Sequence, residues 1–198
     1  MTAQISDCVI LGGTEFAVAG VSGEGLFDPQ ANGLAPSMIN TACWRGYVCW
    51  YAVGDDRLIL DQLVLGGETT LDGEAIEPGA SVLGQPAHPS QDGFFAGCLQ
   101  LRRLRVPVPF SGGLLLGEGF VSSTYVHMGF HPAWRYESVV ELLAHEGRVT
   151  EIADRSAEMA AIRRRIAEGD QADPDGERGG PVWIERTFTL DYTRSGLG

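Results

Sequence analysis

TACWRGYVCWYAVGDDRLILDQLVL, residues Thr41–Leu65, is the stretch of sequence that decides the fold. Two apolar runs rich in aromatic and β-branched residues flank the polar turn Gly54–Arg57, which is typical of a β-hairpin. The first run is apolar on both faces, with Trp44, Val48 and Trp50 on one face and Tyr47, Cys49, Tyr51 and Val53 on the other. A strand covered on both faces predicts a barrel, the centre of a sandwich, or a sheet with a helix behind it.

Further strand patterns lie on both sides of this hairpin. Gly12-Gly13 separates Cys8–Leu11 from Thr14–Ala19, which predicts a second hairpin. The other expected strands are Phe94–Val108, Gly113–Gly117, Phe120–Phe130, Tyr136–His145 and Arg148–Ile152. Val21–Asn40, with one short turn of helix, and Gly66–Gly93 are expected to be loops because both are rich in turn residues. The predicted fold is mainly β, an antiparallel meander that forms a small barrel or a strongly bent sheet.

One helix is expected near the C-terminus, over Arg155–Glu168, where Asp154 or Ser156 can cap its start. Its narrow apolar stripe of Met159, Ile162 and Ile166 predicts that it lies on the sheet surface. An acidic linker, Gly169–Gly180, and a final strand, Pro181–Arg194, are expected to follow. We therefore expect a β-rich domain over residues 1–154, with residues 155–198 packed on the same domain.

The composition excludes some chemistry and disfavours some partners. All 14 positively charged residues are arginine, which excludes Schiff-base lysine chemistry and a P-loop lysine. The formal net charge of −12 disfavours nucleic acid and anionic membranes as partners. It suits a protein partner with a basic surface, although the same charge also serves to keep a protein in solution.

The sequence predicts a cytoplasmic protein with free thiols. Met1–Asp7 lacks the pattern of a signal peptide, and no apolar run is long enough to span a bilayer. The four cysteines, Cys8, Cys43, Cys49 and Cys98, lie in strand-like runs without CxxC spacing. They are expected to be buried and unpaired, and no cofactor is predicted.

Acid–base chemistry has one set of candidates in the sequence. Tyr125, His127 and Glu118 could provide it if neighbouring strands bring their side chains together. His127 and His131 have a spacing that suits a metal on a helix, but Gly129 and Pro132 argue against a helix there. No metal site is therefore predicted, and buried or surface polar residues remain the simpler interpretation.

Ligand-binding candidates lie in the first hairpin strand. Trp44, Tyr47, Trp50 and Tyr51 could line a ligand cavity, or they could simply be core residues. Arg45 could recognise an acidic ligand or form a structural ion pair. Arg45 needs a carboxylate partner in so apolar a strand, and Asp61 on the facing strand is the expected one. Three more arginines, Arg102, Arg103 and Arg105, are interpreted as a solvated strand edge or as an anchor for an anionic partner.

Two motifs resemble a family of small, uncharacterised bacterial proteins. TACWRGYVCWYAVGDDRLIL (Thr41–Leu60) is similar to the family's WRGY strand and its hairpin. PFSGGLLLGEGFVSSTYVHMGFHPAWRYESVVEL (Pro109–Leu142) is similar to its YVHMG block, and the opening hairpin fits a third position. The resemblance covers residues 1–150 and departs from the family at Gly112–Leu114 and Phe130–Trp134. It implies a compact β-rich, cytoplasmic protein of accessory or immunity type, and it implies no activity.

Three functions stay open at this point. The leading hypothesis is a non-enzymatic binding or accessory protein that acts through a protein–protein surface. The alternatives are a small-molecule-binding β-barrel that uses the aromatic strand and an enzyme that uses Tyr125, His127 and Glu118. A flat or concave acidic face with apolar patches larger than a few hundred Å² would favour the first. A deep apolar cavity beside Trp44 or Trp50 would favour the second, and convergence of the three polar side chains the third.

Overall fold

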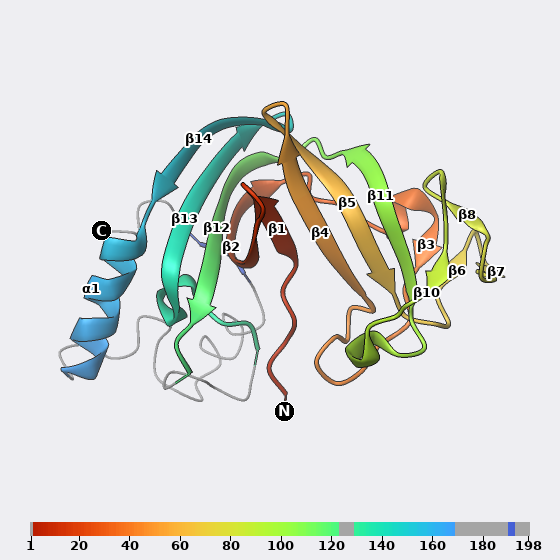
Figure 1. Cartoon of the computed structure of the whole chain (residues 1–198), viewed down its shortest axis with the longest axis horizontal. Helices are drawn as coiled ribbons and strands as arrows, with labels where there is room; N and C mark the ends of the chain where they lie inside the picture. The colour runs from red at the N-terminus through yellow and green to blue at the C-terminus, as the bar shows by residue number, and fades with distance from the viewer. Residues whose placement is uncertain (1, 123–128, 169–189, 193–198) are drawn as a thin grey trace.

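A nine-stranded sheet dominates the computed structural model, which describes residues 2–122, 129–168 and 190–192 (Figure 1). The strands of this sheet are β1 (Cys8–Leu11), β2 (Thr14–Glu24), β4 (Tyr47–Gly54), β5 (Arg57–Leu65), β10 (His88–Pro89), β11 (Leu99–Pro107), β12 (Ser111–Phe120), β13 (Tyr136–His145) and β14 (Arg148–Asp154). Their order is β10-β11-β5-β14-β13-β12-β2-β1-β4. With one helix, α1 (Ser156–Ala167), the described fold is mainly β, as predicted.

Both predicted hairpins are present. In the β4–β5 hairpin, Asp55 and Asp56 have φ angles of 50° and 57°, the left-handed conformation that a two-residue turn matching the strand twist requires. Gly12 and Gly13 make the corresponding turn between β1 and β2. The first hairpin strand begins at Tyr47, so Trp44 precedes it instead of sharing a face with Trp50.

The sheet bends until its two sides meet. β4 pairs with β1 on one edge and with β5 on the other, and β5 also pairs with β14 at Arg57 and Arg148. These pairings connect seven strands into a ring, and Figure 1 shows the arched sheet. The strongly bent sheet is therefore confirmed. The parallel pairing of β1 with β4 is the departure from a purely antiparallel meander.

Three apolar clusters stabilise this sheet. The largest contains fully buried side chains from most strands, among them Tyr51, Leu60 and Leu116, and also Phe110 from the link between β11 and β12. The second lies between α1 and the sheet, and the third lies outside β4 and contains Val48. Because Cys49 and Tyr51 face the first cluster while Val48 and Trp50 face the third, β4 is covered on both faces, as its sequence predicts.

Helix α1 is joined to the sheet by both apolar and charged contacts. Met159 is buried in the second cluster, and Ile162 and Ile166 pack against it. The N-cap residue of α1 is Arg155 and not, as predicted, Asp154 or Ser156, and its side chain makes no capping hydrogen bond. The Asp154 carboxylate accepts a hydrogen bond from the N–H of Ser156, the first helical residue (2.8 Å). No helix in the described part of the chain is long and apolar enough to cross a membrane.

A buried carboxylate lies beneath the start of α1. The Glu141 side chain on β13 is 1% exposed and accepts hydrogen bonds from Arg155 at 2.8 and 3.0 Å. The Tyr192 hydroxyl donates to its other oxygen at 3.1 Å. Leu190–Tyr192 are the described residues of the expected final strand, and they form a parallel bridge with Val21 of β2.

The structure moves several of the predicted boundaries. β2 continues to Glu24 instead of ending at Ala19, because β12 pairs with β2 from Ala17 to Glu24. The region Gly66–Gly93 is not only loop, since it contains short strands that pair in hairpins. These are β6 (Thr70–Leu71), β7 (Glu74–Ala75), β8 (Ser81–Val82) and β9 (Gln85–Pro86), with β6 also paired to β3 (Leu34–Ala35).

Two short 3-10 helices also replace expected strand or loop. Gly93–Phe95 forms η2, which delays the start of β11 to Leu99, and Ala133–Arg135 forms η4 before β13. The predicted turn of helix in the first long loop is η1, Gln30–Asn32. Residues 123–128 of the expected strand Phe120–Phe130 and the whole of the expected acidic linker, Gly169–Gly180, lie outside the described residues.

Candidate functional site

Arg45 forms a largely buried ion pair, but not with the expected partner. Its guanidinium donates hydrogen bonds to both Asp7 oxygens, at 2.6 and 3.0 Å, so the prediction of Asp61 was wrong. Arg45 precedes β4, whereas Asp61 lies between Leu60, the partner of Tyr51, and Gln62, the partner of Trp50, farther along the hairpin. Asp7 immediately precedes β1, whose parallel pairing places it beside the start of β4.

The Asp7 carboxylate also organises the backbone of β4. One of its oxygens accepts a hydrogen bond from the Cys49 N–H at 2.7 Å, and the Arg45 guanidinium lies 4.8 Å from the centre of the Tyr47 ring. Burial disfavours the charged form of Arg45, but Asp7 more than offsets this, so that the pKa of Arg45 is raised. This cluster is therefore a structural clamp between β1 and β4, which was one of the two interpretations of Arg45.

The predicted aromatic candidates do not converge on one cavity. Tyr51 is 1% exposed within the main core, where its hydroxyl accepts a hydrogen bond from the Phe27 N–H. Trp50 points to the opposite face of β4 and packs edge-on against Phe95, with ring centres 6.0 Å apart. Trp44 lies outside the strand and is exposed. Because they separate onto different faces, these side chains do not form the lining of a single barrel interior.

Three exposed apolar residues are chain neighbours of residues in the third cluster. That cluster buries Cys43 and Phe95, with Ile39 packed against it. Each of these residues has an exposed apolar neighbour in the chain: Met38 (62% exposed), Trp44 (57%) and Phe94 (57%). We call Met38, Trp44 and Phe94 the apolar patch. Figure 1 shows its two segments, the link between β3 and β4 and the short helix η2, beside each other at one edge of the molecule.

Local hydrogen bonds fix both segments of the apolar patch. The Asp92 carboxylate caps η2 by accepting from the Phe94 N–H at 2.8 Å, and the tight turn directs Phe95 inward and Phe94 outward. In the other segment, the Ile39 N–H donates to the Cys43 carbonyl at 3.2 Å. The side chains of the patch are therefore held at the surface by backbone segments that defined hydrogen bonds fix in place.

Two carboxylates flank the apolar patch. Asp92 is exposed beside Phe94, and Glu68 is exposed where its backbone N–H donates to the Ser37 hydroxyl at 3.0 Å, next to Met38. An apolar centre with an acidic rim is complementary to a protein surface with an apolar centre and a basic rim.

The acid–base candidates are only partly described. Glu118 is exposed near the end of β12, while Tyr125 and His127 lie outside the described residues. His131 is half-buried, accepts a hydrogen bond from Arg135 on its Nδ1 (3.2 Å) and lies 4.6 Å from Phe120 between ring centres. No group of three or more metal-ligating side chains occurs among residues 2–122, 129–168 and 190–192.

The His131 environment predicts a pH effect on stability. Burial, and next the charge of Arg135, lower the pKa of His131 from 6.5 to about 4. Because the unfolded chain takes up this proton at higher pH than the folded one, the free energy of unfolding is expected to fall as pH is lowered from 6.5 towards 5. Urea unfolding at several pH values checks this, with His131→Gln expected to flatten the dependence. An imidazole that titrates near 6.5 by NMR would contradict it.

The cysteines are poorly suited to nucleophilic chemistry. All four are free, with Cys43, Cys49 and Cys98 buried and Cys8 half-buried. Burial raises the pKa of each thiol above its usual value, so each is held in the protonated form. Free, buried thiols were predicted at all four positions, and the structure confirms this for Cys43, Cys49 and Cys98, whereas Cys8 is free but only half-buried.

Comparison of the chain with protein-family models, with curated proteins and with solved structures finds no match. The candidate site therefore stands on the geometry of this chain alone.

Sequence reasoning missed Met38 and Phe94 as surface residues and Asp7 as the partner of Arg45. The Phe94-Phe95 pair carries a usable signal, because adjacent residues in extended or tightly turned chain face different ways. Asp92-Gly93 just before it has the composition of a capped turn. Met38 and Asp7 have no comparable local signal, since their positions depend on contacts between distant segments.

Proposed function

We propose that this protein is a non-enzymatic binding or accessory protein of the cytoplasm that acts through a protein–protein surface centred on the apolar patch. The observation that carries the proposal is that Met38, Trp44 and Phe94 are all more than half exposed around one small cluster. Grouped exposed apolar side chains mark interaction sites more often than scattered ones do. Tryptophan is also among the residue types that contribute most to interface affinity.

The charge of the chain supports a partner with a basic surface. The net charge of −12 attracts such a partner over long range, and Asp92 and Glu68 provide carboxylates at the edge of the apolar patch. The resemblance of the WRGY and YVHMG motifs to small accessory or immunity-type proteins points to the same class of function.

Capture of the partner from lysate of the source cells tests this proposal. We expect tagged full-length protein to retain one protein at fixed stoichiometry in native mass spectrometry. Trp44→Ser and Phe94→Ser should each weaken the complex by about tenfold or more, because truncation of an interface anchor costs upwards of about 2 kcal/mol. The matched control is Ile152→Ser, since Ile152 is an apolar residue of β14 that is 49% exposed outside the patch.

Two results would refute the proposed surface. One is the absence of any stoichiometric partner with the wild-type chain. The other is a partner that all three serine variants retain equally, because this would place the interface elsewhere on the molecule.

A further inference from the structure

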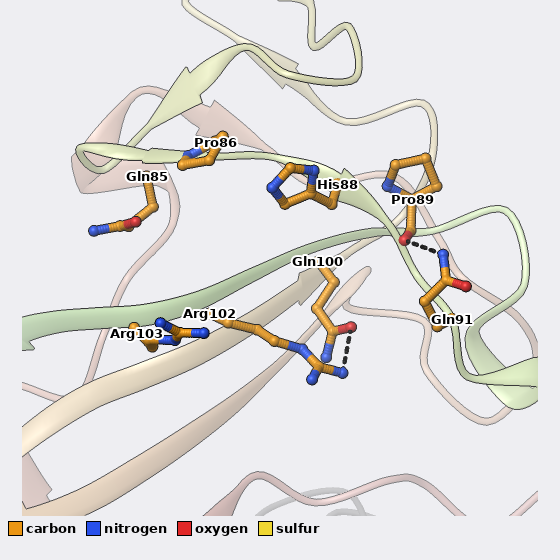
Figure 2. Close-up of a pocket in the computed structure, with 8 residues that line it drawn as sticks. All are labelled: Gln85, Pro86, His88, Pro89, Gln91, Gln100, Arg102 and Arg103. Atoms are coloured by element: carbon orange, nitrogen blue, oxygen red, sulfur yellow. Dashed lines mark hydrogen bonds between the residues drawn. The ribbon is translucent and has the colours of Figure 1, made fainter.

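A polar groove opens where β10 separates from β11. Its volume is about 570 Å³, and it is lined by Gln85, Pro86, His88, Pro89, Gln91, Gln100, Arg102 and Arg103. β10 pairs with the start of β11 at Leu99 and Gln100. The groove is also lined by Gln85 and Pro86 of β9, which belong to the β8–β9 hairpin. Figure 2 shows Gln85, Pro86 and His88 on one side of the groove and Gln100, Arg102 and Arg103 on the other.

A β-bulge brings the two arginines into the same groove. In a regular strand, consecutive side chains such as Arg102 and Arg103 point to opposite faces. Here the pairing of β11 with β5 shifts between Arg102 and Val106, and Arg103 and Arg105 adopt left-handed φ angles of 55° and 52°. The irregular backbone redirects Arg103, so that Arg102 and Arg103 both line the groove.

The groove is cationic on a strongly acidic protein. None of its lining residues is a carboxylate, and neither arginine forms an ion pair with any carboxylate in the part of the chain that is described. The Gln100 amide oxygen accepts a hydrogen bond from Arg102 at 3.0 Å, which orients the guanidinium without neutralising its charge. The remaining lining side chains offer amide and imidazole groups that can donate further hydrogen bonds.

We propose that this groove binds a small organic anion that carries two or more oxyanion groups. Guanidinium groups bind phosphate and carboxylate through paired hydrogen bonds, and two adjacent arginines suit a ligand with two such groups. The volume lies within the range of small-molecule sites. No Phe, Tyr or Trp is among the described residues that line the groove, so the polar groups of the ligand would provide most of the recognition.

Protection of a sheet edge is the competing explanation for these arginines. Natural sheets use charged side chains, bulges and proline on their edges to prevent pairing with other chains, and β11 has all three. Arg105 separates the two explanations. It shares the strand, the bulge, the exposure and the left-handed backbone with Arg103, but it does not line the groove.

Calorimetric titration of the full chain with pyrophosphate and, separately, with citrate tests the proposal at an ionic strength of about 0.15 M, where distant charges are screened. We expect saturable one-to-one binding of at least one probe. Arg102→Gln and Arg103→Gln should each weaken it by about tenfold or more, and Arg105→Gln by less than about twofold. Binding of pyrophosphate alone indicates a phosphorylated ligand, and binding of citrate alone indicates a polycarboxylate.

The proposal is overturned if neither probe binds saturably, or if Arg105→Gln weakens binding as much as the two groove variants do. The urea midpoint of each variant identifies any that is misfolded, and Arg102→Lys, which keeps the charge but loses the paired hydrogen bonds, gives a second variant with an expected intermediate loss. Because none of these residues belongs to the apolar patch, the outcome is independent of partner capture.

Discussion

Replacing Asp7 with alanine is expected to lower the free energy of unfolding by about 3–5 kcal/mol, the usual result of removing one partner of a buried ion pair. The Arg45 side chain is only 26% exposed and that of Asp7 only 10%, so water replaces the lost carboxylate poorly. The substitution also removes the acceptor of the Cys49 N–H in the middle of β4. The loss of the ion pair and the loss of the backbone hydrogen bond therefore both weaken the contact between β1 and β4.

Asp7→Asn is the matched variant for this prediction. It keeps the size of the side chain and an oxygen for the Cys49 N–H, but it removes the charge that Arg45 requires. We expect its loss of stability in urea to lie between those of the wild type and Asp7→Ala. A loss below about 1 kcal/mol for Asp7→Ala would show that Arg45 finds solvent or another acceptor, and that the clamp is no stronger than a surface ion pair.

The local elements of the fold were predictable because their information is local. The two apolar runs at residues 47–54 and 57–65, rich in aromatic and β-branched residues, and the polar turn between them specify a hairpin without any long-range contact. The same is true of Tyr136–His145 with Arg148–Asp154, and of α1, which starts one residue later and ends one residue earlier than expected.

The partner of Arg45 was not predictable by the same reasoning. The register of a hairpin relates a strand only to the antiparallel strand that follows it in the chain. This reasoning suggests Asp61 as the partner of Arg45. The actual neighbour of β4 is β1, which lies parallel and is separated from it by β2 and a long connection. Nothing in a single sequence specifies that pairing, because it depends on how the whole sheet bends.

The two candidate surfaces show the same limit. The sequence contains Arg102, Arg103 and Arg105 as a basic run, but only the bulge decides which two line the groove. Likewise Trp44 was expected on a strand face, and it is exposed because the strand begins three residues later, at Tyr47. A β-bulge at the groove, and a strand that starts later than expected at Trp44, are therefore what sequence reasoning missed at the two surfaces.

Replacing Gly66 with alanine is expected to destabilise the protein by about 2–4 kcal/mol, mainly through overpacking. A Cβ atom at this position would lie 2.0 Å from the Ser37 carbonyl oxygen. This oxygen belongs to the backbone, so it cannot move aside as the end of a flexible side chain could. Displacing Ser37 would also weaken its hydrogen bonds with Thr69 (3.1 Å) and Glu68 (3.0 Å), each worth about 1 kcal/mol. Urea unfolding provides the measurement.

Gly54→Ala is the control, because Gly54 also lies outside the left-handed region but a Cβ there would have no neighbour within 4 Å. We expect it to change stability by less than about 0.5 kcal/mol. A loss below about 1 kcal/mol for Gly66→Ala would mean that the segment around Ser37 shifts without cost, and that its docking on the glycine is not tight.

The same substitution connects the fold to the proposed surface. Ser37 is held against Gly66 and Gly46, and Met38 and Ile39 follow it directly in the chain. If Ser37 is displaced, Met38 moves with it and the third cluster loses its cover, so Gly66→Ala should weaken partner capture although Gly66 itself is buried. Gly54→Ala should leave capture unchanged. A partner retained by a destabilised Gly66→Ala chain would show that Trp44 and Phe94 act without the Met38 segment, which would reduce the functional surface to those two aromatic side chains.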